Sequence, residues 1–330
     1  MRAAVRDPAP DPPQSVPRHM RRNEAGDLDN LPGPEFARFR DEPPQMRSGA
    51  VGKSGLLRLG FERRDGRTIL AQLESRAPYL AQRALHCDEA LPDLAWLFLI
   101  TTSGCVLQGD RLHLDLALAA GARAHVTTQS ATKVHAMDAN YAWLTQTIAL
   151  ADDAYLEFLP DPLIPHRQAR LASETRIAIA PSATLLYSEI VAPGRKHHHP
   201  DERFGATLLS LAVTAARSDG RLLFSERLVV EPQSNPVRQT GVMDSFDAFG
   251  NVILLTPKEH ADRIHERVGA EVDHAQGVAY GACRLPNEAG LIFKVLGRET
   301  AQVTAQVRAF WEIVRREVVG AAIPTSFQWR

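Results

Sequence analysis

Three consecutive histidines, His197, His198 and His199, are the most obvious metal-binding feature of the sequence. Neutral imidazole is a suitable ligand for Ni²⁺, Cu²⁺ and Zn²⁺. In an extended strand, however, adjacent side chains point to opposite faces, so three in a row seldom converge on one ion. Two interpretations therefore stay open: a polar loop between strands, or a transient metal contact that involves His197 and His198.

Two carboxylates, Glu189 and Glu226, lie within strand-like apolar runs, each in phase with the large apolar residues of its run. Alternation along a strand therefore predicts that both acids point inward. A buried carboxylate is costly unless it is paired, hydrogen-bonded or next to a wet cavity. One interpretation is a salt bridge, with Arg227 or Arg195 as the partner. The other is a polar lining, inside an apolar β structure, that can handle a divalent cation.

A third candidate region combines a tight turn with a hydroxyl-rich strand. In Gln108-Gly109-Asp110-Arg111 a glycine precedes an acid, which is typical of a tight turn. The run Thr127–Lys133 is polar but β-prone, and it has more hydroxyls than a solvent-facing loop needs. By itself this run suits either a sugar-binding strand or a hydrogen-bonded feature of the core.

Common catalytic motifs are absent from the sequence. Gly52-Lys53-Ser54 resembles the end of a phosphate-binding loop, but Arg47 stands where that motif needs a glycine. The Gly-x-Ser-x-Gly elbow and the His-Glu-x-x-His and Gly-x-Gly-x-x-Gly patterns are missing as well. The residues alone therefore indicate a protein without a recognisable active site.

The elements that position these residues are predicted to be mostly strands up to about residue 250. Asp65-Gly66 and Asp219-Gly220 each join two strand-like runs, which predicts β-hairpins. Between them, an alanine-rich turn that leads into a strand-like run occurs three times, at offsets of 32 and 29 residues. The three turns begin at Ala117, Ala149 and Ala178. This period predicts a stacked β-hairpin or β-helix-like solenoid of many short strands, and an ordinary antiparallel sandwich is the alternative.

In the C-terminal part, about residues 251–330, strand-like apolar runs alternate with apolar residues at helical spacing, which predicts two α-helices. Strands are expected at Val252–Thr256, Val278–Arg284 and Leu291–Leu296, and helices at Pro257–Val268 and Glu299–Val319. By contrast, residues 1–48 hold nine of the 22 prolines and few large apolar residues, which predicts a disordered or loosely attached extension. Residues 49–330 are expected to form a single β-rich domain whose fold begins near Val51.

Composition restricts the class of protein. The 330 residues are 44% hydrophobic, and 38 basic against 39 acidic side chains leave a net charge of −1. This balance gives no electrostatic reason to expect nucleic acid or a membrane surface as a partner. Three scattered cysteines disfavour a disulfide framework, and no apolar run approaches the roughly 20 residues that span a bilayer. A cytoplasmic protein is expected.

Several runs, in this order along the chain, resemble the UreD (UreH) family of urease accessory proteins. The resemblance covers about residues 50–330, with two departures, since Cys105 and Gln108 stand where the family usually has glycine. The matching runs are Leu56–Glu74, Arg76–Tyr79, Thr102–Asp110 (with Gly109 and Asp110), Gly121-Ala122, Thr127–Lys133 (with Thr127, Thr128, Gln129, Thr132 and Lys133), Leu156–Pro160, Glu189, Gly194-Arg195, Glu202–Phe204 and Pro324–Trp329.

The resemblance implies a mainly β, non-catalytic scaffold for assembly of the urease metallocentre. Its implied partners are apo-urease, UreF and the GTPase UreG, and its implied cargo is nickel(II), bound transiently during passage through an internal tunnel. Passage favours several weak sites over one tight cage. The acids Asp110, Glu157, Glu189 and Glu226 are then the expected tunnel-lining oxygens, with His197 and His198 as further contacts.

Two other functions compete with this one. Paired acids on a β-solenoid are typical of polysaccharide hydrolases or lyases. Such enzymes are usually secreted and rich in aromatic residues for sugar stacking, whereas aromatic residues make up 6% of this chain. A nickel-storage protein would need far more metal ligands than the 12 histidines and three cysteines present.

Overall fold

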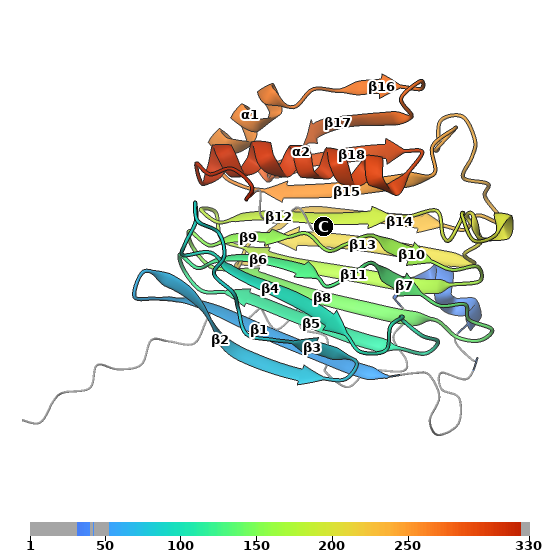
Figure 1. The fold of residues 1–330 in the computed structure, drawn as a ribbon, viewed down its shortest axis with the longest axis horizontal. Helices are drawn as coiled ribbons and strands as arrows, with labels where there is room; N and C mark the ends of the chain where they lie inside the picture. Colours follow the sequence, from blue (N-terminus) through green and yellow to red (C-terminus); the bar gives the residue numbers. More distant parts are fainter. Residues whose placement is uncertain (1–31, 40–41, 43–52, 325–330) are drawn as a thin grey trace, which may run out of the picture.

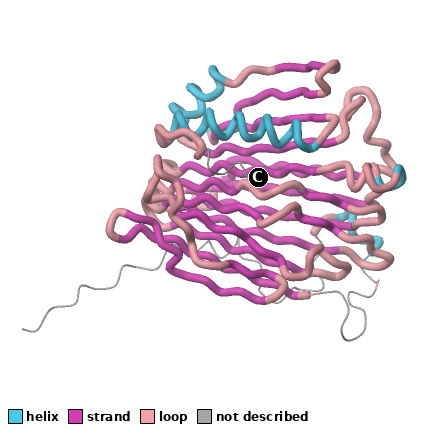
Figure 2. The backbone as a smooth tube through the Cα atoms, in the orientation of Figure 1, coloured by secondary structure: helices cyan, strands magenta, loops and turns pink. Residues whose placement is uncertain are grey.

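Two stacked β-sheets make up most of the molecule in a computed structural model, which describes residues 32–39, 42 and 53–324. Figures 1 and 2 show long strands stacked in parallel layers, with two α-helices against one end of the stack. The mainly β fold predicted from the sequence is confirmed. In the part of the chain described, no helix is long and apolar enough to cross a membrane.

The first sheet, called sheet A, has seven strands in the order β14-β13-β11-β8-β5-β1-β2. Its strands are β1 (Ser54–Arg64), β2 (Arg67–Arg76), β5 (Arg111–Leu118), β8 (Ala142–Leu150), β11 (Arg170–Ile179), β13 (Leu208–Ala216) and β14 (Leu222–Val230). The middle of sheet A is parallel, and the strands at both of its ends pair antiparallel with their neighbours.

The second sheet, called sheet B, has eleven strands, nine of them in the order β16-β17-β18-β15-β12-β9-β6-β4-β3. Those nine are β3 (Tyr79–Ala81), β4 (Ala95–Thr101), β6 (Arg123–Thr128), β9 (Tyr155–Phe158), β12 (Thr184–Val191), β15 (Ala248–Leu255), β16 (Glu271–Asp273), β17 (Val278–Arg284) and β18 (Gly290–Gly297). Two short strands, β7 (Thr132–Val134) and β10 (Leu163–Pro165), extend it beside β12.

The three repeats predicted from the alanine-rich turns are present, but they are not hairpins. Each repeat is an arch that leaves sheet A, turns, and enters sheet B, as in β5 to β6, β8 to β9 and β11 to β12. Its strands pair in parallel with those of the next repeat. The turn alanines Ala122, Ala154 and Ala183 are at most 1% exposed. Because the arch packs inside the core, only a small side chain fits at the bend.

True hairpins occur at the two Asp-Gly pairs. Asp65 and Gly66 have φ of 49° and 77° between antiparallel β1 and β2, which is the two-residue turn with positive φ at both positions. Asp219-Gly220 lies between β13 and β14, which also pair antiparallel. These two hairpin predictions are confirmed, and they begin and end sheet A.

The C-terminal part packs on the outer face of sheet B. Helix α1 (Lys258–Arg267) and helix α2 (Thr300–Val318) form an apolar cluster with β12, β15 and β18. Figure 1 shows α2 lying along this end of the sheet, with α1 beside it. Sheet B is therefore buried on both faces over this region, because the core between the sheets covers the other side.

Part of the segment expected to be a loose extension is packed against the body. The 3₁₀ helix η2 (Pro34–Phe39) places Phe36, which is 0% exposed, on the outer face of sheet A with Trp143 and Leu208. Arg227 also donates to the carbonyl of Pro32. The prediction relied on the proline-rich composition of the whole segment and did not consider its few aromatic residues. Residues 1–31 lie outside the described part of the chain, as do Val51 and the residues after Pro324 in the expected terminal run.

Candidate functional site: a polar cavity between the sheets

A cavity of about 130 Å³ lies between the two sheets. Its wall is mostly apolar, with hydroxyls and amides at intervals. The polar side chains in the wall are Tyr79, Thr101, Thr128, Gln129, Ser130, Thr132, Gln146, Asp161, Ser173, Tyr187, Ser188 and Glu189. Gln129 and Ser130 are also exposed, so the cavity opens to solvent at the turn after β6.

The hydroxyl-rich run singled out in the sequence forms this mouth. Thr128, Gln129, Ser130 and Thr132 line the cavity, and the Thr128 hydroxyl accepts a hydrogen bond of 2.9 Å from the backbone of Asp161. Thr127 points away from the cavity and is buried, and Lys133 is exposed. Alternation along β6 and β7 accounts for this division.

Deeper in, Glu189 ends a ladder of hydrogen bonds that joins the sheets. The Gln146 amide donates to the hydroxyl of Thr175 at 2.9 Å, and that hydroxyl lies 3.1 Å from the hydroxyl of Tyr187. Tyr187 in turn donates to Glu189 Oε1 at 2.9 Å. Gln146 and Thr175 come from sheet A, and Tyr187 and Glu189 come from β12 of sheet B. The ladder holds the carboxylate at a fixed place in the cavity wall.

Glu226 of β14 was also predicted to point inward, but its side chain is 30% exposed and lies outside the cavity lining, and Leu222 and Leu228 of the same parity are exposed. Asn251 of β15 pairs in register with Glu189, and its amide donates to Glu226 Oε2 at 3.1 Å. Lys294 of β18 forms an ion pair with the other oxygen of Glu226. The row Glu189–Asn251–Lys294 thus crosses three strands of sheet B, and it ends at Lys294, whose side chain is 52% exposed.

The Glu189 carboxyl is only partly exposed, and it touches solvent through the cavity. The pKa of Glu189 is raised from 4.5 to about 7, mainly by burial and in smaller part by the neighbouring charge of Glu226. Hydrogen bonds from Tyr187 and Asn251 act in the opposite direction without cancelling the effect of burial. Near neutral pH this carboxyl therefore exists in both protonation states.

The salt-bridge partners considered from sequence are wrong for both acids. Arg227 contacts Glu35 and the hydroxyl of Ser210, and Arg195 pairs with Glu202 at 2.5 Å. The partners that the structure supplies were missed, namely Gln146, Thr175, Asn251 and Lys294. Their signal in the sequence is weak, because a polar residue at an inward position of one strand does not reveal which strand faces it.

Glu157, expected beside Glu189, faces the opposite side of sheet B. It is 0% exposed beneath α2, where its carboxylate accepts from the Tyr155 hydroxyl at 2.7 Å and lies 3.2 Å from Arg315 Nε. His125 Nδ1 is 2.7 Å from its other oxygen. Burial raises the pKa of Glu157, but the His125 hydrogen bond and the Arg315 charge outweigh burial and lower it. Glu157 therefore fastens α2 to the sheet, away from the cavity.

Further buried contacts around Glu157 and Arg315 hold the C-terminal end of α2 against the sheet. Arg315, which is 0% exposed, also forms an ion pair with Asp88 in the loop before β4. The His125 ring packs against the indoles of both Trp96 and Trp311, with centroid distances of 3.7 and 5.1 Å. The cost of burying these charges is offset because each charged group has a partner of opposite sign.

Asp110 lies behind the cavity wall and serves the turn in which it stands. Its two oxygens accept from the backbone amides of Lys53 and Leu107, both at 2.8 Å, and its side chain is fully buried. Gly109 before it has φ of 75°, which confirms the tight turn. Tyr79 lies between Asp110 and the cavity, and burial together with the Asp110 charge raises its pKa.

The three histidines form an exposed loop, separate from the cavity. The side chain of His197 is 79% exposed, 3.2 Å from Glu299 Oε2, and His199 caps the 3₁₀ helix η3 (Pro200–Glu202). Gly194, just before them, has φ of +104°, and a Cβ there would be 2.1 Å from the carbonyl oxygen of Glu202. Among the described residues, no group of three or more His, Cys, Asp or Glu side chains is placed to hold a metal ion.

Comparison with known proteins matches residues 53–330 to a family described as "UreD urease accessory protein". "Urease accessory protein UreD" of Yersinia pseudotuberculosis serotype O:1b (strain IP 31758) is 55% identical over 297 residues, which are 90% of this chain and 92% of the relative. The protein of that name from Photorhabdus laumondii subsp. laumondii matches with the same figures. "Urease accessory protein UreD 2" of Brucella suis biovar 1 is 49% identical over 295 residues, covering 89% and 98%.

Proposed function

Because this chain belongs to the UreD urease accessory protein family, we propose that it assists assembly of the nickel centre of urease as a scaffold and not as an enzyme. Its partners are apo-urease, UreF and the GTPase UreG, as the family resemblance implies. Its work takes place in the cytoplasm. The free thiols of Cys87, Cys105 and Cys283 support this location, since free thiols persist in a reducing compartment.

Within this role, nickel(II) passes through the cavity between the sheets as cargo. The observation that carries the proposal is the Glu189 carboxyl in the cavity wall, with a polar row that leads from it to the exposed end of Lys294. A second polar region of the cavity is its opening to solvent, at Gln129 and Ser130. These polar groups support the proposed path of the ion through an otherwise apolar core.

The chemistry of Glu189 suits a brief stop for a divalent cation. With a pKa of about 7, the carboxyl gives up its proton readily when a cation approaches, and it takes a proton back when the cation leaves. The hydroxyl of Tyr187 is a neutral oxygen 2.9 Å from the carboxyl, and the hydroxyl of Thr175 lies 3.1 Å beyond it. One carboxylate with neutral oxygens binds a divalent ion weakly, which permits onward movement.

The test uses the full chain, co-expressed with the urease subunits and the other accessory proteins. We expect Glu189→Gln to leave the complex intact by pull-down but to lower urease activity and the nickel content of urease by about tenfold, the usual cost of losing a group that orients a metal. Glu74→Gln is the matched control, since Glu74 is on a surface strand and its side chain is 47% exposed. Full activation by both Glu189→Gln and Glu226→Gln would refute passage through the cavity.

A further inference from the structure

A second cavity, of about 680 Å³, lies at the opposite end of the strands from α1, and six of its nine lining side chains are charged. The lining residues are Lys196, His197, Pro200, Arg203, Arg238, Ser245, Asp247, Arg298 and Glu299. They come from three separate segments: the loop between β12 and β13, the loop between β14 and β15, and the turn between β18 and α2. This cavity is distinct from the one between the sheets, with which it shares no lining residue.

Lys196 and Asp247 hold these three segments together. The ammonium group of Lys196 is 3.1 Å from Asp247 Oδ2, 2.7 Å from Glu299 Oε1 and 2.6 Å from the carbonyl oxygen of Arg298. Arg203 Nε donates to Asp247 Oδ1 at 2.9 Å. Asp247 is 3% exposed, so these contacts are well shielded from water. These contacts fix the relative positions of the three segments, so the cavity is preformed.

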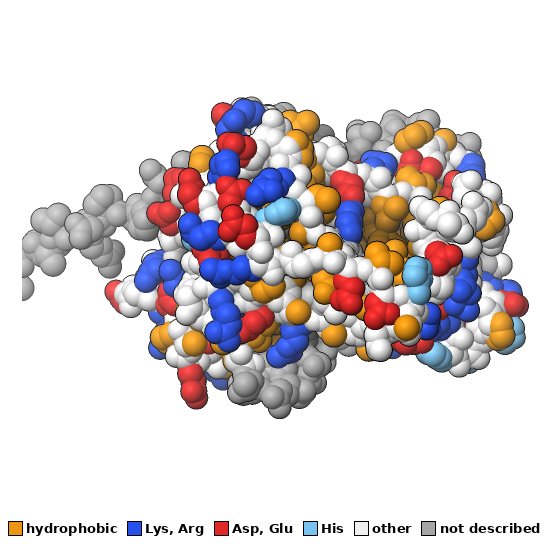
Figure 3. Space-filling model, turned by 90° about the horizontal axis from the view of Figure 1, so that it is seen from above, with side chains coloured by type: hydrophobic (Ala, Val, Ile, Leu, Met, Phe, Trp, Pro, Cys, Tyr) orange, Lys and Arg blue, Asp and Glu red, His pale blue; other side chains and the backbone are white. Residues whose placement is uncertain are grey.

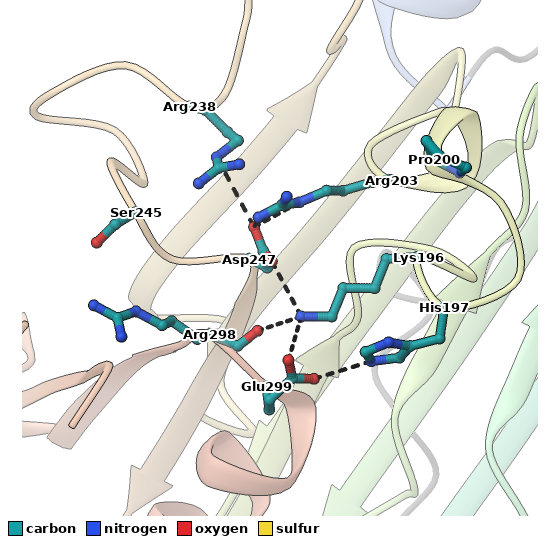
Figure 4. A pocket seen from close by; sticks show the side chains of 9 residues that line it. All are labelled: Lys196, His197, Pro200, Arg203, Arg238, Ser245, Asp247, Arg298 and Glu299. Carbon is teal, nitrogen blue, oxygen red and sulfur yellow. Dashed lines mark hydrogen bonds and ion pairs between the residues drawn. The ribbon is translucent and has the colours of Figure 1, made fainter. Parts of the chain in front are cut away.

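Arg238 and Arg298 are exposed, and in the described part of the chain neither one donates to a carboxylate within hydrogen-bond distance. Arg238 approaches Asp247 Oδ1 no closer than 3.9 Å, and its hydrogen bond is to the carbonyl oxygen of Asp244 at 3.5 Å. Arg298 donates to the carbonyl oxygen of His274 and, within the described part of the chain, pairs with no carboxylate. A guanidinium has five N–H donors, so both groups can still bind an oxyanion. Figure 4 shows the Arg238 guanidinium directed toward Asp247, while the Arg298 side chain extends away from Lys196 and Asp247.

The charges of the lining do not balance. Four basic side chains face two acidic ones, which leaves an excess of two positive charges in the cavity. The molecule as a whole has a net charge of −1, and Figure 3 shows basic and acidic side chains intermixed over the face it presents. The positive excess is therefore a local property of this cavity, and it favours a ligand with two or more negative charges.

We propose that this cavity binds a compact, low-molecular-mass polyanion that carries at least two carboxylate or phosphate groups. Its volume is within the range of small-molecule sites. Pro200 is the one apolar side chain in the lining, so the cavity offers no aromatic surface for a nucleobase. The arginine pair supplies forked donors that match the oxygens of both groups. This site is independent of nickel passage.

The experiment is calorimetric titration of the purified full chain, in metal-free buffer at constant ionic strength, with citrate and with pyrophosphate. We expect saturable one-site binding of one or both, and the more tightly bound probe identifies the preferred group. Arg238→Gln should weaken binding by about tenfold, as for the loss of one charged hydrogen bond. Arg298→Gln should have a similar effect, and the far-UV circular dichroism spectrum checks that each variant is folded.

Arg316→Gln is the matched control, because Arg316 is on α2, 62% exposed and outside the cavity. Its affinity should equal that of the unchanged chain. The proposal is overturned if neither probe binds, if the three variants bind equally well, or if a polyglutamate peptide binds and neither small polyanion does. The last result would assign the basic cavity to a protein partner instead.

Discussion

The raised pKa of Glu189 predicts that this single carboxyl makes the protein less stable as the pH rises. Its pKa in the folded chain, about 7, lies above its ordinary value of 4.5, so folding favours the protonated form. The free energy of unfolding is therefore highest below pH 4.5 with respect to this group, and the advantage is lost as the pH rises through 7. At about 1.4 kcal/mol per pH unit, the difference between the two values amounts to about 3 kcal/mol.

Glu189→Gln removes this dependence, because an amide can accept from Tyr187 as the neutral acid does and does not ionise. At pH 5 the variant should be more stable than the unchanged chain by less than about 1 kcal/mol. At pH 8 the variant should be more stable by about 2–3 kcal/mol, the lower figure allowing for solvent contact through the cavity.

Urea denaturation followed by tryptophan fluorescence, at half-unit steps from pH 5 to 8, measures this difference directly. The quantity to plot is the stability of Glu189→Gln minus that of the unchanged chain, because other titrating groups then cancel. Glu74→Gln, on the surface, should give a flat line near zero. A flat line for Glu189→Gln as well would refute both the raised pKa and the proton exchange on which the proposed cation stop depends.

Two further variants test the framework around the sites. Arg315→Met should lower the free energy of unfolding by about 3–5 kcal/mol, because two carboxylates stay buried without their cation, whereas Arg316→Met should change it by less than about 0.5 kcal/mol. Gly194→Ala should cost about 2–4 kcal/mol, because its Cβ would meet the carbonyl oxygen of Glu202 at 2.1 Å. Gly269→Ala, with open space around its Cβ, should be neutral. Thermal and urea denaturation measure all four, and equal stabilities within either pair would contradict the contacts described.

The alternation of side chains along a strand predicts which residues face inward, but not which residues of other strands lie opposite them. Glu189 and Glu226 were both predicted to point inward. Glu189 lines the cavity, whereas Glu226 is 30% exposed, lies outside the lining and connects to Glu189 only through Asn251. The same reasoning did not place Glu157, because β9 is apolar on both faces, with the core on one side and α2 on the other. Alternation identifies the inner face of a strand only where the other face is wet.

The period of the repeat could be predicted from the sequence, but the pairing of its strands could not. An alanine-rich bend at a fixed period is compatible with a hairpin or with an arch between two sheets. The difference depends on whether the two strands pair with each other or with the next repeat, and those partners are about 30 residues away. The anchor at Phe36 was missed for a similar reason, since its contacts with Trp143 and Leu208 are far away in sequence.

The attachment of α2 has a consequence for how the chain is made. The ion pair between Asp88 and Arg315 joins residues 227 positions apart, and the helix covers an apolar face formed by strands that were synthesised long before it. At roughly 5–20 residues per second, the ribosome needs on the order of 10–45 s to pass from one partner to the other. Until α2 emerges, the apolar face that includes Trp96 and Leu186 stays uncovered, so the exposure of the nascent chain to aggregation is greatest just before this helix is complete.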